Sequence, residues 1–355
     1  MENSEVVATL ALSLVPGVGP QRLRLLISTF GSAQATLASR HSGVNASLAD
    51  AERVMAQLAE LGARVLLLGC PEFPPQLEEI HDPPPILYIW GDHALLTRPS
   101  VAIVGSRDHT AYGAEAARIL AGAVATRAVV VSGMARGIDA IAHHAALDAG
   151  GRTIGVLGNG FGVIYPQSNR DLYDRIVKHG GGCLVTEHPP WEKPHTGSFP
   201  RRNRLISGLA RAVVVVEAGD KSGALNTARE ATEQNRPVLA VPGPITSRTS
   251  YGTNCLIRDG AKPALTAGDI LEEIGIHTKL AELGIALSTP APRMPPVDLT
   301  GLQLTLWNRM TSEPQHVDAL VGAAQTQPAD VLGALTELEL RGLVRQGPGM
   351  VFGLT

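Results

Sequence analysis

The stretch VAIVGSR at residues 101–107 decides the fold, because a continuous β-branched apolar run leads directly into a glycine and a basic residue. Short apolar runs of this kind are typical of strands buried on both faces of a parallel sheet that helices cover. The sequence therefore predicts an α/β protein with an extended Rossmann-like, doubly wound, mostly parallel sheet. Further runs with the same pattern are AVVVSG (128–133), RTIGVLG (152–158), GCLVTE (182–187), AVVVVEA (212–218) and PVLAVPG (237–243).

The segments on either side of these runs predict smaller domains. Residues 1–65 have apolar residues at helical spacing and predict a helical domain of the SAM or helix-hairpin-helix type. Residues 66–286 are assigned to the Rossmann-like domain, whose Pro-rich start at 70–99 predicts a structured connector, since proline disrupts regular helix. A proline-rich linker follows at 287–299. Residues 300–355 predict three helices and two short strands, the outline of a winged helix.

The turn PGVGP at 16–20 leaves two interpretations open. A glycine-rich turn before a helix presents backbone N–H groups to a phosphate, and Arg22 and Arg24 favour that interpretation. For a single copy, a plain turn between two helices is the favoured interpretation.

Composition limits the function. The 355 residues are 44% hydrophobic and 18% charged, which predicts a folded globular protein. A formal net charge of -3 predicts no general attraction to polyanions, so a nucleic-acid site has to be a local patch. Cys70, Cys183 and Cys255 form no CxxC pair, which disfavours disulfides and zinc and favours a cytoplasmic location. No apolar stretch is long enough to predict a membrane span.

The loops that follow the predicted strands mark the ligand-binding edge, because open α/β sheets bind ligands at the carboxyl ends of their strands. A glycine there allows a tight turn that aims N–H groups and a helix N-terminus at an anion. Lys221 beside a helix N-terminus is unfavourable unless an anion joins it. The residues predicted at this edge are Gly105, Ser106, Arg107, Ser132, Gly133, Lys221, Ser222 and Gly223.

The segment FPRRNRLISGLA at 199–210 combines an aromatic residue with a cationic cluster. Stacking of a base on an aromatic ring contributes about 1–3 kcal/mol, and basic side chains bind phosphates, so Phe199, Arg201, Arg202 and Asn203 suit single-stranded nucleic acid. The alternative is a solvated basic helix start with Phe199 in the core.

The sequence contains few patterns that are typical of catalysis. Asp139 and His143 lie four apart on a predicted helix and could form an acid/base pair, or could cap and pair within that helix. The glycine after Gly105 is Gly113, which does not complete GxGxxG, and neither HExxH nor GxxxxGK[ST] occurs. We therefore expect no cofactor, no metal and no catalytic residue.

Six blocks in order, VAIVGSR, SGMARGIDAIAH, FPRRNRLISGLA, KSGALNTA, VPGP and GTNCLIRDGA, resemble the DNA-processing protein A (DprA/Smf) family over roughly residues 70–275. The resemblance implies a cytoplasmic homodimer without known catalysis. It would bind single-stranded DNA during natural transformation and load the RecA recombinase onto it.

The resemblance also implies roles for individual residues. Phe199 would stack on a base, while Arg107, Arg202 and Lys221 would meet phosphates. Which of Arg201, Arg202 and Arg204 faces DNA stays open, because one of them could pair with a carboxylate instead.

The sequence leaves two alternatives to single-stranded DNA binding, a nucleotide-processing enzyme and a winged helix that binds duplex DNA or a protein. The predicted fold also resembles nucleotide phosphoribohydrolases, but their PGGxGTxxE signature is absent and KSGALNTARE leaves Glu230 as the only candidate acid. The winged helix could instead bind duplex DNA or a protein. Its acidic Asp318, Glu337 and Glu339 disfavour strong DNA binding.

Overall fold

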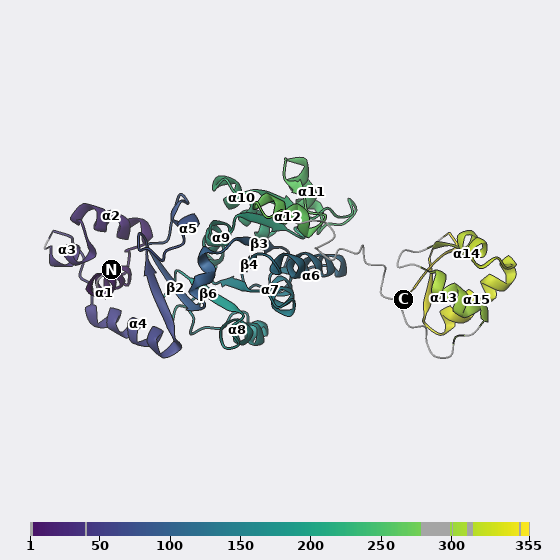
Figure 1. Ribbon diagram of the computed structural model, residues 1–355, viewed down its shortest axis with the longest axis horizontal. Coiled ribbons are helices and arrows are strands. Elements are labelled where there is room, and N and C mark those ends of the chain that lie inside the picture. The colour runs from purple at the N-terminus through teal and green to yellow at the C-terminus, as the bar shows by residue number, and fades with distance from the viewer. Residues whose placement is uncertain are drawn as a thin grey trace. The chain divides into compact units, whose positions relative to one another are not determined.

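The computed structural model divides the chain into two compact units, Met1–Gly284 and Ile285–Thr355 (Figure 1). The proline-rich linker predicted at 287–299 lies, except for Leu299, outside the described residues. The structure describes residues 3–39, 41–277, 299, 301–310, 315–347 and 349–354.

Within its described residues, the first unit contains a nine-stranded sheet in the order β1-β2-β6-β5-β4-β3-β7-β8-β9. The strands from β6 to β9 pair in parallel, whereas β1 and β2 add antiparallel pairs at the β6 edge. The bounds are β1 Ala63–Leu67, β2 Ile86–Gly91, β3 Ser100–Val104, β4 Val129–Ser132, β5 Thr153–Val156, β6 Gly182–Thr186, β7 Ala212–Val215, β8 Val238–Ala240 and β9 Lys262–Pro263.

All six apolar runs form parallel strands, which confirms the predicted doubly wound sheet. Successive residues of β3 point to opposite faces, so Val101 and Ile103 pack into one core while Ala102 and Val104 pack into the other. The helices α6 (Ala111–Ala125), α7 (Ile138–Asp148) and α12 (Ala267–Glu273) cover the first face. The second face is covered by α5 (Pro75–Glu78), α9 (Ser198–Leu209) and α10 (Gly223–Glu233).

The predicted connector at 70–99 is wrong in one respect, because it contributes a strand to the sheet. No proline lies between Pro85 and Pro99, so Ile86–Gly91 keeps every N–H that the ladder needs and pairs with β1 on one side and β6 on the other. Tyr88 is 1% exposed in this strand. The boundary predicted after residue 65 falls inside β1.

The N-terminal helices share a core with this edge of the sheet. Leu10, Leu23 and Leu58 lie in one buried cluster with Tyr88 of β2 and Tyr173 of α8 (Arg170–Val177). Of the two arginines near PGVGP, Arg24 pairs with Asp82 at 2.5 Å, which ties the helices to the sheet domain. The helices are α1 (Asn3–Ser13), α2 (Pro20–Phe30), α3 (Ala33–Ala38) and α4 (Leu48–Leu61).

The second unit is a winged helix, as predicted. Its three-stranded sheet has the order β10-β12-β11 and packs with three helices around Leu306, Leu320, Leu335 and Phe352. The elements are α13 (Gly301–Arg309), β10 (Gln315–His316), α14 (Val317–Ala324), α15 (Pro328–Leu340), β11 (Val344–Gly347) and β12 (Val351–Leu354).

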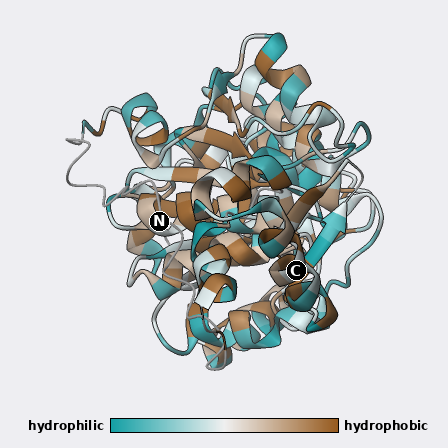
Figure 2. Ribbon diagram, turned by 90° about the vertical axis from the view of Figure 1, so that its right-hand side faces the viewer, coloured by the Kyte–Doolittle hydropathy of each residue, from teal (hydrophilic) through white to brown (hydrophobic). Residues whose placement is uncertain are grey.

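Hydrophobic and hydrophilic segments alternate along the helices in Figure 2, as expected of helices that bury one side only. In the part of the chain that the structure describes, no helix has the length and apolar character needed to cross a bilayer.

Candidate nucleic-acid interface

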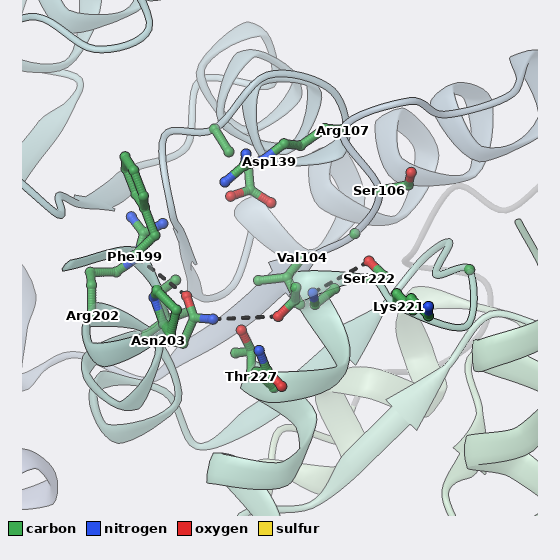
Figure 3. A pocket seen from close by; sticks show the side chains of 18 of the residues that line it. Val104, Ser106, Arg107, Asp139, Phe199, Arg202, Asn203, Lys221, Ser222 and Thr227 are labelled. Atoms are coloured by element: carbon green, nitrogen blue, oxygen red, sulfur yellow. Dashed lines mark hydrogen bonds between the residues drawn. The ribbon is translucent and has the colours of Figure 1, made fainter. Parts of the chain in front are cut away.

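The candidate site lies where the order of the strands reverses. From β3 the chain winds outward through β4, β5 and β6, then returns to place β7 on the other side of β3. The loops after β3 and β7 therefore diverge and leave a crevice at the carboxyl ends of the strands. A cavity of about 570 Å³, here called the rim pocket, occupies it (Figure 3). Predicted residues in its lining are Gly105, Ser106, Arg107, Phe199, Arg202, Asn203, Lys221, Ser222 and Gly223.

The loop after β3 is held by backbone contacts that require glycine. The Ser106 N–H donates to the Glu217 carbonyl at 2.7 Å, and the Ser106 carbonyl accepts from the Ile138 N–H at 3.2 Å. Gly137 has φ +81°, and a Cβ there would lie 2.4 Å from the Ser106 carbonyl oxygen. The loops after β3 and β4 consequently pack backbone against backbone, which fixes the position of Arg107.

The helix after this loop does not present its N-terminus to a ligand, contrary to the prediction. The buried Glu217 carboxylate accepts the Thr110 N–H at 2.8 Å and the Thr110 hydroxyl at 2.7 Å, at the cap of α6. It also accepts the Thr249 hydroxyl at 3.0 Å. The chain's own carboxylate thus occupies the place that was expected for an external anion.

The second side of the rim pocket comes from α9. Phe199 is half-buried, and the Arg107 Cζ atom lies 5.7 Å from the centre of its ring. Figure 3 shows Phe199, Arg202 and Asn203 on one side of the cavity, facing Ser222 and Lys221 on the other. The Asn203 Nδ2 group donates to the Gly223 carbonyl at 3.4 Å, which links α9 to the start of α10.

Arg202 forms part of the floor, and its partners are protein groups. It is 4% exposed, and one guanidinium nitrogen donates to the Gly133 carbonyl at 2.5 Å and to the Val156 carbonyl. Asp139 accepts the Gly133 N–H at 3.1 Å. Burial lowers the pKa of Arg202 to about 10, opposed by the Asp139 charge, and burial raises the pKa of Asp139. The pair holds the ends of β4 and β5 together, so a phosphate would compete with those carbonyls.

The other two arginines of α9 lie elsewhere. Arg204 is 6% exposed and pairs with Glu187 at 2.7 Å and Asp82 at 3.2 Å, which is the carboxylate pairing that the sequence left open. Arg201 also pairs with Glu187, at 3.2 Å, and lines a separate hollow beside Pro20. Arg201 therefore does not line the rim pocket, because helical spacing turns it to another side of α9 than Arg202.

Two residues predicted after β4 have different positions. Ser132 is fully buried and donates its hydroxyl to the Ile103 carbonyl at 2.7 Å, so it does not line the rim pocket. Gly133 lines an adjoining cavity instead. A Cβ at Gly133 would lie 2.7 Å from the Asp139 carboxylate, which explains the glycine.

The third side is the start of α10. Ser222 caps the helix and accepts the Ala224 N–H at 3.4 Å. The first turn contains no acidic residue, and Lys221 is exposed without an ion-pair partner in the described residues. A helix N-terminus and a cation therefore face the same cavity, which suits an anion. Asn226 and Thr227 also line it and were missed, although their spacing from Gly223 on a helix is a signal that marks them.

Comparison with known proteins identifies the family. A model of DNA recombination-mediator protein A matches residues 64–275, and a model of the DprA winged helix domain matches residues 290–350. The chain belongs to the DNA-processing protein A (DprA/Smf) family.

Individual members of the DprA/Smf family agree with this assignment. The chain is 34% identical to Protein Smf of Synechocystis over 99% of each chain, and 43% identical to the DNA processing protein DprA of Bacillus subtilis over 62% of this chain and 75% of that one. The X-ray structure of DprA from Streptococcus pneumoniae superposes with a TM-score of 0.64 at 33% identity, covering 77% of this chain and 98% of that one.

A second DprA structure, from Helicobacter pylori, is described as giving insight into a unique single-stranded DNA binding mode. It superposes with a TM-score of 0.54 at 32% identity and covers 60% of this chain and 96% of that one. All three sides of the rim pocket lie inside the segment that matches the DprA domain model.

The possible acid/base pair of this DprA-family chain is not formed in the structure. His143 is fully buried and its Nδ1 lies 2.6 Å from the Thr153 hydroxyl, whereas Asp139 pairs with the Gly133 N–H. Burial lowers the pKa of His143 to about 3. Each residue fixes a strand end outside α7, so both are structural, but through partners other than the pairing within the helix that the sequence suggested.

The residues considered for two further chemistries are not brought together in the described part of this DprA-family chain. Glu230, the candidate acid of the phosphoribohydrolase alternative, lies farther along α10 and does not line the rim pocket. Within the described ranges, no group of three or more His, Cys, Asp or Glu side chains is arranged to hold a metal ion.

Proposed function

We propose that this DprA-family chain binds single-stranded DNA in the rim pocket, without sequence preference, and loads a RecA-type recombinase onto it. The observation that carries the proposal is that Phe199, Arg107 and Lys221 all line the rim pocket, where the strand order reverses and where α10 begins. Arg107 and Lys221 come from the loops after β3 and β7, Phe199 comes from the first turn of α9, and all three are at least partly exposed.

Each group suits one part of a nucleotide. Lys221 and Arg107 provide charge for phosphates, and the positive end of the α10 dipole adds to it. Phe199 offers an aromatic surface, and stacking tolerates any base because every base has a π-face. A negatively charged protein binds a polyanion in this way through a local cluster of cations.

The family supports the same function. The Helicobacter pylori DprA structure is described by its single-stranded DNA binding mode, and the matching family model is described as a DNA recombination-mediator protein. Recombinase loading, a homodimeric assembly and a cytoplasmic location are further parts of the proposal and rest on the family resemblance.

Binding across a range of salt concentrations tests the pocket. For fluorescent oligo(dT), the plot of log K against log salt has a slope of about 0.7 per phosphate neutralised. Replacing Arg107 and Lys221 together by alanine should weaken binding and reduce the slope by about 1.4, since two contacts are lost.

The matched control replaces Arg152 and Arg211, which precede β5 and β7 at the opposite edge of the sheet. This pair removes the same charge and should leave the slope near that of the wild type. Equal slopes for the two double variants would refute binding in the rim pocket.

A truncation separates this proposal from duplex-DNA binding by the winged helix. A chain that lacks residues 288–355 should keep its affinity for single strands within about twofold. Retained preference for single over double strands in that chain supports the proposal, whereas loss of all DNA binding favours the winged helix as the DNA-binding unit.

Recombinase loading needs its own assay. A RecA-type recombinase on circular single strands coated with single-strand-binding protein should begin ATP hydrolysis earlier when this chain is added. The Arg107/Lys221 variant should not shorten that delay, and the Arg152/Arg211 variant should. Light scattering of the purified chain checks the dimer.

The phosphoribohydrolase alternative has a direct test. Nucleoside monophosphates incubated with the chain should release no base. Release that disappears in Glu230→Gln would overturn the binding-only proposal.

A further inference from the structure

A second cavity of about 340 Å³ adjoins the rim pocket at the ends of β4 and β5. Its volume falls in the range of about 300–1,000 Å³ that is typical of small-molecule sites. Arg107, Phe199 and Arg202 line both cavities and form the wall between them. The predicted site residues Arg107, Gly133, Phe199 and Arg202 line this cavity, but neither the sequence motifs nor the family resemblance gives a role to Tyr165 or Arg136.

The second cavity has an aromatic wall of its own. Tyr165 follows β5 and is 43% exposed, and its ring centre lies 5.4 Å from that of Phe199 at an interplanar angle of 34°. The Tyr173 hydroxyl donates to the Tyr165 carbonyl at 3.2 Å, which fixes the backbone there. One side of Tyr165 therefore packs on Phe199 while much of the ring remains open to a ligand.

The charges of this cavity suit an anionic ligand. Arg107 and Arg136 both line it, and no acidic residue appears among the described residues of its lining. Arg136 pairs with Asp108 at 3.2 Å, but the two side chains are 62% and 90% exposed. An ion pair so open to solvent contributes little, so Arg136 is available to a phosphate at small cost.

The positions of the two cavities match neighbouring units of one strand. The rim pocket lies over β3 and β7, and the second cavity lies over β4 and β5, so the cavities follow one another along the carboxyl edge of the sheet. In the order β5-β4-β3-β7 the midpoints of the two strand pairs lie two strand spacings apart, about 10 Å. Stacked nucleotides rise only about 3.4 Å, so the two bases would be splayed apart instead of stacked on each other. Arg107 stands between the cavities, where the linking phosphate would run.

We propose that the second cavity binds the nucleobase next to the one held in the rim pocket, stacked on Tyr165, with the intervening phosphate held by Arg107 and Arg136. This inference rests on the proposed function, because it presumes a strand in the rim pocket. It makes the binding unit of one protomer at least two nucleotides long.

A length series of 5′-phosphorylated thymidine oligonucleotides, from one to six nucleotides, tests the inference on the full chain by calorimetry. The wild type should gain affinity sharply from one to two nucleotides. Tyr165→Ala should lose about tenfold or more for two nucleotides and longer, the range expected for one lost stack, and should keep the affinity for one.

Tyr165→Phe is the matched control, since it keeps the ring and loses only the hydroxyl, and it should bind every length within about twofold of the wild type. Unchanged single-nucleotide affinity also shows that Tyr165→Ala has a folded rim pocket. Equal affinity of Tyr165→Ala and the wild type at every length overturns the second subsite and leaves the proposed function intact.

Two other outcomes also count against the subsite. If Tyr165→Ala loses single-nucleotide affinity as well, Tyr165 acts only by supporting Phe199. If the wild type binds no oligonucleotide of any length, the proposed function fails first and this inference fails with it.

Discussion

The exposed wall of the rim pocket and the layer directly beneath it contain the same residue type in opposite situations. Arg107 is exposed and lies over Phe199, whereas Arg202 is 4% exposed and donates to the carbonyls of two strand ends. From the sequence alone, both arginines had the same expected role of binding phosphates. The difference shows that burial, and not residue type, decides whether an arginine is available to a ligand or supports the structure of the pocket.

Removing the buried guanidinium should have the largest effect. Arg202→Met leaves Asp139 without its charge partner and two strand-end carbonyls without a donor, which is expected to cost about 3–5 kcal/mol of folding free energy. Urea denaturation measures it. Arg107→Met is the control and should stay within about 0.5 kcal/mol of the wild type. Equal stabilities for the two variants would contradict the assignment of Arg202 to the structural layer.

Removing the exposed ring should affect binding next. Phe199→Ala is expected to weaken oligo(dT) binding by about 1–3 kcal/mol, the value of one base stack. Phe199→Tyr keeps the aromatic face and should bind nearly as the wild type does. Fluorescence anisotropy gives both dissociation constants. Wild-type affinity in Phe199→Ala would place the base elsewhere along the edge.

The buried layer should also impose a pH dependence. His143 has a pKa of about 3 in the folded chain against an ordinary value of 6.5, because burial disfavours its charged form. Between these values the unfolded chain binds the extra proton, so His143 makes stability fall as pH falls, by up to about 1.4 kcal/mol per unit. The contribution is complete above the ordinary pKa and is lost toward pH 3.

The variant His143→Asn isolates that contribution, since its amide can still donate to the Thr153 hydroxyl and has no charge to gain. The free energy of unfolding should fall less between pH 7 and pH 5 in His143→Asn than in the wild type. Parallel pH curves would show that His143 is not kept neutral by burial.

The smallest effect on stability is expected at Lys221. Its sign should be opposite to that of the buried Arg202, because replacing Lys221 should stabilise the free protein. Lys221 precedes the N-terminus of α10, where a positive charge is unfavourable, so Lys221→Gln should stabilise the free protein by about a few tenths of a kcal/mol. The same change should weaken DNA binding and lower its salt dependence. Thermal unfolding with and without oligo(dT) measures both, and a destabilised free protein would contradict this placement.

Much of the fold was predictable because its signals are local. A strand buried on both faces needs a continuous apolar run, and such runs located β3 to β8 within three residues at each end. The strand β2 was missed because prolines precede it closely and suggested an irregular connector. The pairing that makes it a strand is with β1 and β6, which lie outside its own segment.

The candidate site was predictable in part. Glycines at strand ends and the first turn of α10 located the rim, since the backbone needs glycine where loops approach closely. Nothing local marks Tyr165, which reaches the site only because its loop folds back onto Phe199. Nor does the local sequence show that Glu217 fills the N-terminus of α6.

The sequence by itself determined the class of the sheet, the winged helix and the edge on which the site lies, because apolar periodicity and glycine positions are properties of short segments. Only the tertiary structure decided which arginine has which role. Arg204 is taken by Asp82 and Glu187, Arg202 by Gly133 and Val156, and Arg107 stays exposed. Those partners are distant in the chain, and a charge is free to bind a ligand only where folding has given it no partner of its own.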